Sequence, residues 1–240
     1  MLRFTPVNSR TPITQGRTGR SRSRSGSAET LTREDRKAAT RRAIIDSALK
    51  LLDERSFSAL SLREVTRGAG IVPGAFYRHF DSMDALGLVL IDESFRSLRE
   101  MLRGARSGEL DLNRVIESSV DILTAGVTEQ REYWRFIVRE RSSGVASLRY
   151  AIRTEIRLIT SELATDLARF RQLRDWSTED LNIMASLIVN SMIIVAEALE
   201  DATDATAVEE IKRAAVKQLR MIAVGIAGWR STAANPREQT

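Results

Sequence analysis

The chain has 240 residues, 42% of them hydrophobic, which is enough for one large domain or two modest domains with a substantial core. It contains no cysteine, which excludes disulfides, cysteine-ligated zinc and thiol nucleophiles, and which fits a reducing, cytoplasmic location. The net charge of +5 is uneven, because residues 1–80 carry 16 Lys and Arg against 7 Asp and Glu, whereas the remainder is net acidic. A polyanionic partner is therefore expected to dock near the N-terminus.

The first 32 residues are rich in Arg, Ser, Thr and Gly and contain few apolar side chains. Such a segment has little hydrophobic surface to offset its ordering entropy, so we expect residues 1–32 to be a disordered, basic N-terminal extension. It also lacks the apolar run of a secretory signal peptide. A basic arm that adds phosphate contacts and a solvated tail both fit this composition, and the lack of an aromatic or groove-reading pattern favours the tail.

Beyond residue 32 the apolar residues recur at helical spacing, and only Pro73 interrupts the chain between residues 13 and 235. Proline destabilises helix interiors, so this scarcity favours an all-α fold. An apolar face predicts a first helix from Thr32, and two short helices follow at about 61–68 and 73–79. Residues 33–82 are therefore expected to form a three-helix domain.

The remaining helices are predicted from further apolar stripes. Asp81 and Ser82 can cap a helix that ends near Gly104. No strand-like alternation of apolar and polar residues runs longer than a few residues. We therefore expect about nine helices, with residues 83–232 forming a helical effector-binding and dimerisation domain and residues 233–240 a tail. The last five helices are expected around residues 116–127, 131–140, 148–170, 181–199 and 211–229.

The most specific pattern lies at residues 61–80, SLREVTRGAGIVPGAFYRHF. Ser61 and Glu64 have the spacing of a capping box, which satisfies free amides at the start of a helix. Gly70 can adopt the left-handed conformation that ends a helix and turns the chain. Pro73 suits the first position of a second helix, and two phenylalanines four residues apart bury one of its faces. The pattern predicts a helix-turn-helix.

The exposed face of the second of these helices is suited to DNA. Gly74 and Ala75 are small residues at its N-terminal end, where they allow the backbone to approach base edges in the major groove. Tyr77, Arg78 and His79 can donate to phosphates, which fix the register of a protein on DNA without reading sequence. We therefore predict a DNA-binding protein.

Residues 36–90 resemble the DNA-binding domain of TetR-family repressors. The shared pattern is an Arg- and Thr-rich first helix, then Leu-Arg-x-Val-x-x-x-Ala-Gly-Ile, then Gly-x-Phe-Tyr-x-His-Phe. The resemblance implies that Tyr77 and His79 contact the DNA backbone, with Arg78 and the two small residues near the bases. The full set of DNA contacts that it implies is Arg42, Ser61, Leu62, Gly74, Ala75, Tyr77, Arg78 and His79.

A narrower resemblance links residues 36–160 to the FabR/DesT-type regulators of unsaturated fatty acid synthesis. It rests on residues 55–65, on the Phe-Tyr-Arg-His-Phe segment and on the patch at residues 134–142. Val72 replaces the Ser or Thr that often caps the recognition helix, and Met83 replaces a phosphate-binding Lys; both departures are compatible with this subgroup. The resemblance implies a repressor of desaturase or related lipid genes whose effector is a long-chain acyl-CoA.

The acyl chain would lie among apolar residues of the C-terminal domain, although the same spacing also fits an ordinary hydrophobic core. Two arginines, Arg139 and Arg141, either meet a ligand phosphate or are ordinary surface residues. Ile159 belongs to the same apolar set. The predicted ligand-binding residues are Phe95, Leu98, Leu102, Leu123, Val127, Trp134, Ile137, Arg139, Arg141 and Ile156.

The helix at 181–199 is apolar on almost every side, a pattern typical of a membrane span or of a helix buried all round. Asn182 and Asn190 interrupt it, so we expect one face to meet its own core and another a second subunit, with no membrane span. Helices 178–199 and 206–229 are accordingly expected to form the four-helix interface of a homodimer. Two helix-turn-helix units would then read a near-palindromic, double-stranded DNA operator.

An enzyme is not expected. His79 is the only histidine and lies on the recognition helix, and the chain has no glycine-rich phosphate loop, metal-ligand cluster or nucleophile elbow. Neither a cofactor nor a metal is predicted. Two alternatives stay open, an adaptor that keeps the helix-turn-helix as a packing unit and a TetR-type repressor of another process, such as efflux, with an unrelated hydrophobic effector.

Overall fold

The computed structural model describes residues 32–105, 111–142 and 144–231, and for residues 101–105 the backbone alone. The predicted C-terminal tail and all but Thr32 of the predicted N-terminal extension lie outside these residues. The described residues form nine α-helices and no strand, which confirms the all-α prediction. The helices are α1 (Arg33–Leu52), α2 (Leu62–Gly68), α3 (Pro73–Phe76), α4 (Met83–Ala105), α5 (Leu112–Glu129), α6 (Arg131–Glu140), α7 (Ala146–Leu167), α8 (Thr178–Asp201) and α9 (Ala205–Gly228), with a 3-10 turn, η1 (Phe57–Ala59), between α1 and α2.

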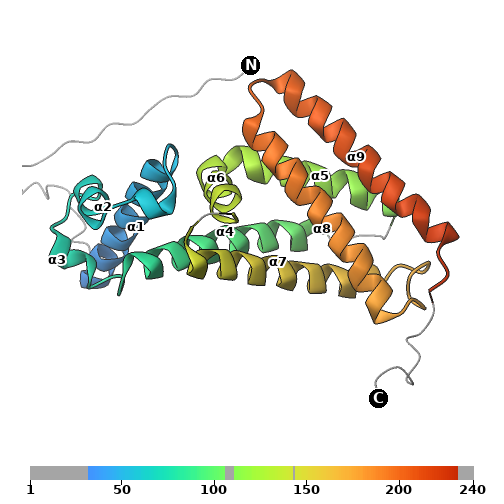
Figure 1. Ribbon diagram of the computed structural model, residues 1–240, viewed down its shortest axis with the longest axis horizontal. Coiled ribbons are helices and arrows are strands. Elements are labelled where there is room, and N and C mark those ends of the chain that lie inside the picture. The colour runs from blue at the N-terminus through green and yellow to red at the C-terminus, as the bar shows by residue number, and fades with distance from the viewer. Residues whose placement is uncertain (1–31, 106–110, 143, 232–240) are drawn as a thin grey trace, which may run out of the picture.

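The helices form a small head and a larger body (Figure 1). α1, α2 and α3 make the head at one end of the molecule. α4 leads from the head along the body, where α7 packs beside it, and α8 packs against α5, α7 and α9. The short helix α6 lies at the junction, in contact with α1 of the head and with α4 and α8 of the body. α6 thus links the head to the body through direct contacts with both.

α1 and α2 each begin with a capping box. The Thr32 side chain accepts from the backbone amide of Asp35, and the Ser61 side chain accepts from that of Glu64, while each carboxylate bonds back to the capping residue. Glu64 also pairs with Arg55 at 2.8 Å. The hydrogen bonds from Ser61, followed by that from Arg55, lower the pKa of Glu64 to about 2. The Glu64 carboxylate in the capping box of α2 therefore stays ionised at neutral pH.

One aromatic ring joins the head to the body. Phe57, in η1, is buried, and its ring centroid lies 6.1 Å from that of Phe136 in α6. A Cβ at Gly87 of α4 would lie 2.8 Å from both the Phe57 ring and the Leu148 side chain of α7. The backbone amide of Phe57 donates to the buried carboxylate of Glu140 at 2.8 Å. One hydrophobic core therefore runs from α1 through α4, α6 and α7.

α6 also holds the C-terminal end of α1 by charged contacts. Arg139 donates to the Leu52 carbonyl at 2.9 Å, where helix carbonyls lack partners within the helix. Arg135 pairs with Asp53, just beyond α1, and with Glu200 of α8 at 2.7 Å. The end of α1 is thus tied through α6 to the end of α8.

Because a methyl group at Gly87 has no space, we expect Gly87→Ala to lower the free energy of unfolding by roughly 1–3 kcal/mol. Gly74→Ala is the matched control, since nothing lies within 4 Å of a Cβ built at Gly74. Urea unfolding of both variants measures the difference. Equal stability of the two variants would show that the Phe57 ring is not held against α4.

Candidate DNA-binding surface and effector cavity

α2 and α3 meet in a tight turn. Gly70 has a φ of 68°, in the left-handed region that favours glycine. The amide of Ile71 donates to the Thr66 carbonyl at 3.0 Å and that of Gly70 donates to the Arg67 carbonyl at 3.1 Å, the two bonds of a Schellman helix end. Pro73 is the first residue of α3. The turn geometry predicted from the sequence is confirmed.

The recognition helix is shorter than predicted, because α3 ends at Phe76 rather than at residue 79. Beyond Phe76 the chain continues in a tighter turn. The amide of Arg78 donates to the Ala75 carbonyl at 3.2 Å, and that of His79 donates to the Phe76 carbonyl at 2.8 Å. Helix ends often tighten into such three-residue bonds, which apolar spacing does not reveal.

α3 and the turn after it have one buried and one exposed face. Phe76 and Phe80 are buried, with ring centroids 5.5 Å apart. The Tyr77 side chain on the other face is 59% exposed. Among the predicted contacts, Ala75, His79 and Leu62 are half-buried and the others on these elements are exposed. The head thus gathers seven of the eight predicted DNA contacts near α2 and α3, namely Ser61, Leu62, Gly74, Ala75, Tyr77, Arg78 and His79.

Arg41 of α1 holds the turn after α3 in place. Its guanidinium lies 4.4 Å from the centroid of the Phe80 ring and donates to the His79 carbonyl at 3.0 Å. Nothing in the local pattern of the sequence marks Arg41 as a functional residue, because its partners lie 38 residues or more along the chain. Arg41 therefore supports the recognition surface from behind.

Arg42, the eighth predicted DNA contact, faces the junction with the body. Its guanidinium pairs with Asp46 at 2.8 Å and lies 3.5 Å from the Glu93 carboxylate of α4. It also donates to the Tyr133 hydroxyl of α6 at 3.4 Å, and Tyr133 in turn donates to Glu93 at 2.9 Å. The structure does not bring Arg42 together with the other seven residues.

His79 lies among positive charges. Its Nδ1 atom is buried and has no hydrogen-bond partner within the described part of the chain. Burial, followed by the charges of Lys37, Arg41 and Arg78, lowers the pKa of His79 from its ordinary value of 6.5. The imidazole is therefore neutral at pH 7, and a nearby phosphate would raise its pKa again.

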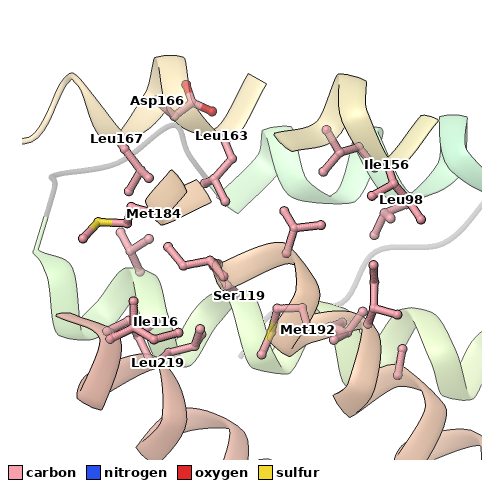
Figure 2. Close-up of a pocket in the computed structure, with 18 of the residues that line it drawn as sticks. Leu98, Ile116, Ser119, Ile156, Leu163, Asp166, Leu167, Met184, Met192 and Leu219 are labelled. Atoms are coloured by element: carbon pink, nitrogen blue, oxygen red, sulfur yellow. The ribbon is translucent and has the colours of Figure 1, made fainter. Parts of the chain in front are cut away.

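The body encloses an elongated cavity of about 220 Å³ between α4, α5, α6, α7, α8 and α9 (Figure 2). Along α8 the lining extends from Met184 to Glu197, which at about 1.5 Å per residue corresponds to about 20 Å. Ser119 and four charged residues are the exceptions to an otherwise apolar wall. The shape and lining suit a long, apolar ligand.

The cavity brings together most of the predicted ligand-binding residues. Val127 packs in the core of α5, α8 and α9 instead, and Arg139 is engaged with the end of α1. The side chain of Leu102 lies outside the described residues. The contribution of α8 and α9 was missed, because their apolar faces were assigned to the core and to the dimer interface. The lining includes Phe95, Leu98, Leu123, Trp134, Ile137, Arg141, Ile156 and Ile159.

The charged residues of the lining form two ion pairs at opposite ends. At the end beside α6, Arg141 and Glu197 approach to 2.7 Å, and each side chain is 33% exposed. At the other end, Arg169 lies 3.7 Å from Asp166, and the Arg169 side chain is 60% exposed. Figure 2 shows the Asp166 carboxylate directed away from the apolar side chains. Each arginine of the lining therefore faces a carboxylate.

Two family models match the chain, one on each part. Residues 44–88 match the bacterial regulatory proteins of the tetR family, and residues 112–225 match the tetracyclin repressor-like C-terminal domain. The chain therefore belongs to the TetR family and is a DNA-binding transcriptional regulator. Members of this family usually bind operators as dimers, respond to small-molecule effectors and are generally not enzymes.

Solved structures share this fold at low sequence identity. A transcriptional regulator from Rhodococcus sp. Rha1 is 20% identical with a TM-score of 0.62, over 79% of this chain and 96% of that chain. The fatty acid degradation regulator FadR from Bacillus halodurans is 14% identical with a TM-score of 0.64, over 80% and 97%. A TetR-family regulator from Streptomyces coelicolor is 14% identical with a TM-score of 0.63, over 79% and 97%. These likenesses show the fold alone.

Phosphate contacts and base contacts have different signatures. If Tyr77 bonds to phosphate, Tyr77→Phe weakens binding to operator and scrambled DNA equally, by roughly 0.5–1.5 kcal/mol. If Arg78 reads a base, Arg78→Gln costs about 1–3 kcal/mol more on the operator than on scrambled DNA. Fluorescence anisotropy with both DNAs measures this, with Arg96→Gln on α4 as the charge-matched control. Equal losses on both DNAs for Arg78→Gln would remove Arg78 from base reading.

The DNA affinity should depend on pH through His79. The pKa of His79 is lowered in the free protein, and a phosphate bound beside it would raise that pKa, so binding would take up a proton and strengthen as the pH falls. His79→Gln should bind with a flatter pH profile between about pH 8 and 5.5. An unchanged profile in that variant would mean that another group takes up the proton.

Proposed function

We propose that this protein is a cytoplasmic, homodimeric repressor of genes of fatty acid desaturation or related lipid metabolism, and that a long-chain acyl-CoA in the cavity sets its DNA affinity. The observation that carries the proposal is the position of α6. This helix lines the apolar cavity through Trp134 and Ile137 and holds the end of α1 through Arg139. A ligand that displaces α6 therefore changes how the head is held.

The homodimer is supported by an apolar surface on α8 and α9. In the single chain, Ile183, Leu187 and Ile194 of α8 are more than half exposed, as are Met221 and Val224 of α9. By length and composition alone, α8 also passes as a membrane-spanning helix. Pairing of these two helices with their copies would cover the exposed side chains in a four-helix bundle. The two heads would then face half-sites about 34–36 Å apart, or a multiple of that spacing.

In this dimer, different exposed residues of the head contact the phosphates and the bases of the DNA. Tyr77 and His79 bind phosphates, and Arg78 reads base edges where the small residues Gly74 and Ala75 let α3 approach the groove. Ser61 and Leu62, at the start of α2, complete the contacts with the DNA backbone. Arg42 we assign to the junction with the body rather than to DNA, because its contacts are with Asp46, Glu93 and Tyr133.

The lipid assignment is supported by the apolar, elongated shape of the cavity and by the resemblance to regulators of unsaturated fatty acid synthesis. The FadR of Bacillus halodurans shares the fold and is named as a regulator of fatty acid degradation. A second candidate is a TetR-type repressor of another process with an uncharged effector. The pairing of Arg141 with Glu197 and of Arg169 with Asp166 favours that candidate, because the lining is neutral as a whole.

Titration of the purified protein on its own upstream DNA separates these candidates. Gel shifts with saturated and unsaturated long-chain acyl-CoA are compared with coenzyme A alone and with the fatty alcohol of the same chain length. A DNA affinity that depends on the acyl chain and not on coenzyme A alone supports the lipid regulator. A response to the alcohol but not to acyl-CoA supports an uncharged effector, and a specific complex indifferent to all of them removes the lipid ligand.

Filling the cavity should abolish the response to ligand without affecting the head. Met192 lines the cavity on α8 and is half-buried, so we expect Met192→Trp to weaken acyl-CoA binding at least about tenfold, equivalent to 1.4 kcal/mol. Binding of ligand-free protein to DNA should stay unchanged. Leu158→Trp, on an exposed position of α7 outside the cavity, is the control. Isothermal titration and anisotropy measure both affinities, and undiminished acyl-CoA binding by Met192→Trp would place the ligand elsewhere.

A further inference from the structure

We propose that the acyl-CoA lies in one direction, with its nucleotide head at the turn between α7 and α8 and the tip of its chain against α6, so that the cavity measures chain length. The inference rests on the acyl-CoA ligand proposed above and adds the orientation of that ligand. It also assigns a binding site for the nucleotide phosphates at the α7–α8 turn.

The two ends of the cavity differ in the geometry and exposure of their ion pairs. Arg141 and Glu197, beside α6, form a short and partly buried ion pair at 2.7 Å. Arg169 and Asp166, at the other end, are 3.7 Å apart, and Arg169 is mostly exposed. An ion pair at that distance with a mostly exposed arginine contributes little to stability, so Arg169 can bind a phosphate group instead with little loss. The head group is therefore favoured at the Arg169 end.

The α7–α8 turn supplies more cations at that end. Arg169, Arg171 and Arg174 are all exposed, and they flank Phe170, whose buried ring lines the cavity. Arg174 lies 3.7 Å from Asp175, a weak pairing, and no ion pair involves Arg171 within the described ranges. Three guanidinium groups on the turn that bears this end of the apolar lining match a ligand that carries phosphates on a long chain. Figure 1 shows this turn at the end of the body far from the head, so the nucleotide would not meet the DNA.

At the opposite end of the cavity, the length of the acyl chain decides whether the chain contacts α6. Trp134 and Ile137 of α6 line it, and Glu197 marks its limit on α8, about 20 Å from Met184 near the other end. Only a chain that extends most of that distance touches α6. Two residues beyond Ile137, the same helix bears Arg139, which holds the end of α1. A short chain would occupy the cavity without reaching the helix that holds the head.

Two native tryptophans report the direction of the chain. Trp134 lines the cavity at the α6 end, whereas Trp176 packs against the cluster that contains Leu167, Phe170 and Met184 at the other end. We would titrate a long-chain acyl-CoA brominated at its terminal carbon into two full-length variants. One, Trp176→Phe with Trp229→Phe, retains Trp134; the other, Trp134→Phe with Trp229→Phe, retains Trp176.

The expected result is strong quenching of Trp134 and little quenching of Trp176, since bromine quenches only at short range. Strong quenching of Trp176 alone would overturn the orientation. The absence of saturable binding, measured on wild-type protein by isothermal titration, would instead remove the proposed ligand itself, and so the two failures are distinguishable.

Substitutions test the phosphate site without relying on fluorescence. We expect Arg169→Gln combined with Arg171→Gln to weaken acyl-CoA binding about tenfold and to leave binding of the fatty alcohol unchanged. Arg96→Gln, an equally exposed arginine with a local carboxylate partner, should change neither affinity. If Arg141→Gln weakens acyl-CoA selectively while the double variant does not, the head group lies at α6 and the proposal is wrong.

Chain length provides the functional readout. In a series of saturated acyl-CoAs, binding should strengthen gradually with length, whereas the effect on DNA affinity should appear only beyond a threshold length. Ala196→Leu adds bulk on α8 close to Glu197 and should move that threshold to shorter chains. A DNA response proportional to ligand occupancy at every chain length would contradict the measurement of length.

Discussion

The fold depends on the contact of Phe57 with the body. A three-residue turn carries this ring into a space bounded by Gly87, Phe136 and Leu148, and the amide of the same residue is held by the buried carboxylate of Glu140. The apolar contact resists separation of the two parts, and the hydrogen bond fixes the direction of the turn, because a hydrogen bond from an amide to a buried carboxylate is strong. The core consequently continues from the head into α4, α6 and α7. The head is thus packed against the body through a shared core and is not a separate domain on a flexible linker.

α6 connects this attachment of the head to the effector cavity. One side of this ten-residue helix lines the cavity, and its charged side chains reach the end of α1 and the end of α8. A ligand influences DNA affinity only by its difference in affinity for two arrangements of the protein, typically about 1–3 kcal/mol of coupling. The polar contacts that α6 makes with α1 and α8 are directional hydrogen bonds and ion pairs, so a rotation of the helix would alter them. The proposed effector therefore acts through α6, because this one helix both lines the cavity and holds the head.

Local signals in the sequence were sufficient to predict the helix-turn-helix of the head, but not the contacts that join the head to the body. The capping box of Ser61 and Glu64, the left-handed Gly70 and the proline that starts α3 are decided by residues within a few positions, and the structure confirms them. The destinations of Arg41, Arg42 and Arg139 depend on residues 38 to 91 positions away, and no local pattern distinguishes them. Periodicity likewise assigned Leu123 and Val127 to one stripe, although only Leu123 lines the cavity. Helical spacing identifies a buried face, and only the packing of neighbouring helices decides whether that face meets a core or a cavity.

The most direct test of the coupling through α6 is the distance between the two heads of the proposed dimer. Because the chain has no cysteine, Arg67→Cys on the exposed side of α2 gives a single labelling site in each subunit. Pulsed electron spin resonance would then record the spin–spin distance with and without saturating long-chain acyl-CoA. A shift of the distance distribution on binding, which Met192→Trp abolishes, is the predicted result. An identical distribution in both states, with ligand binding verified on the same sample, would contradict the transmission of cavity occupancy to the DNA-binding surface.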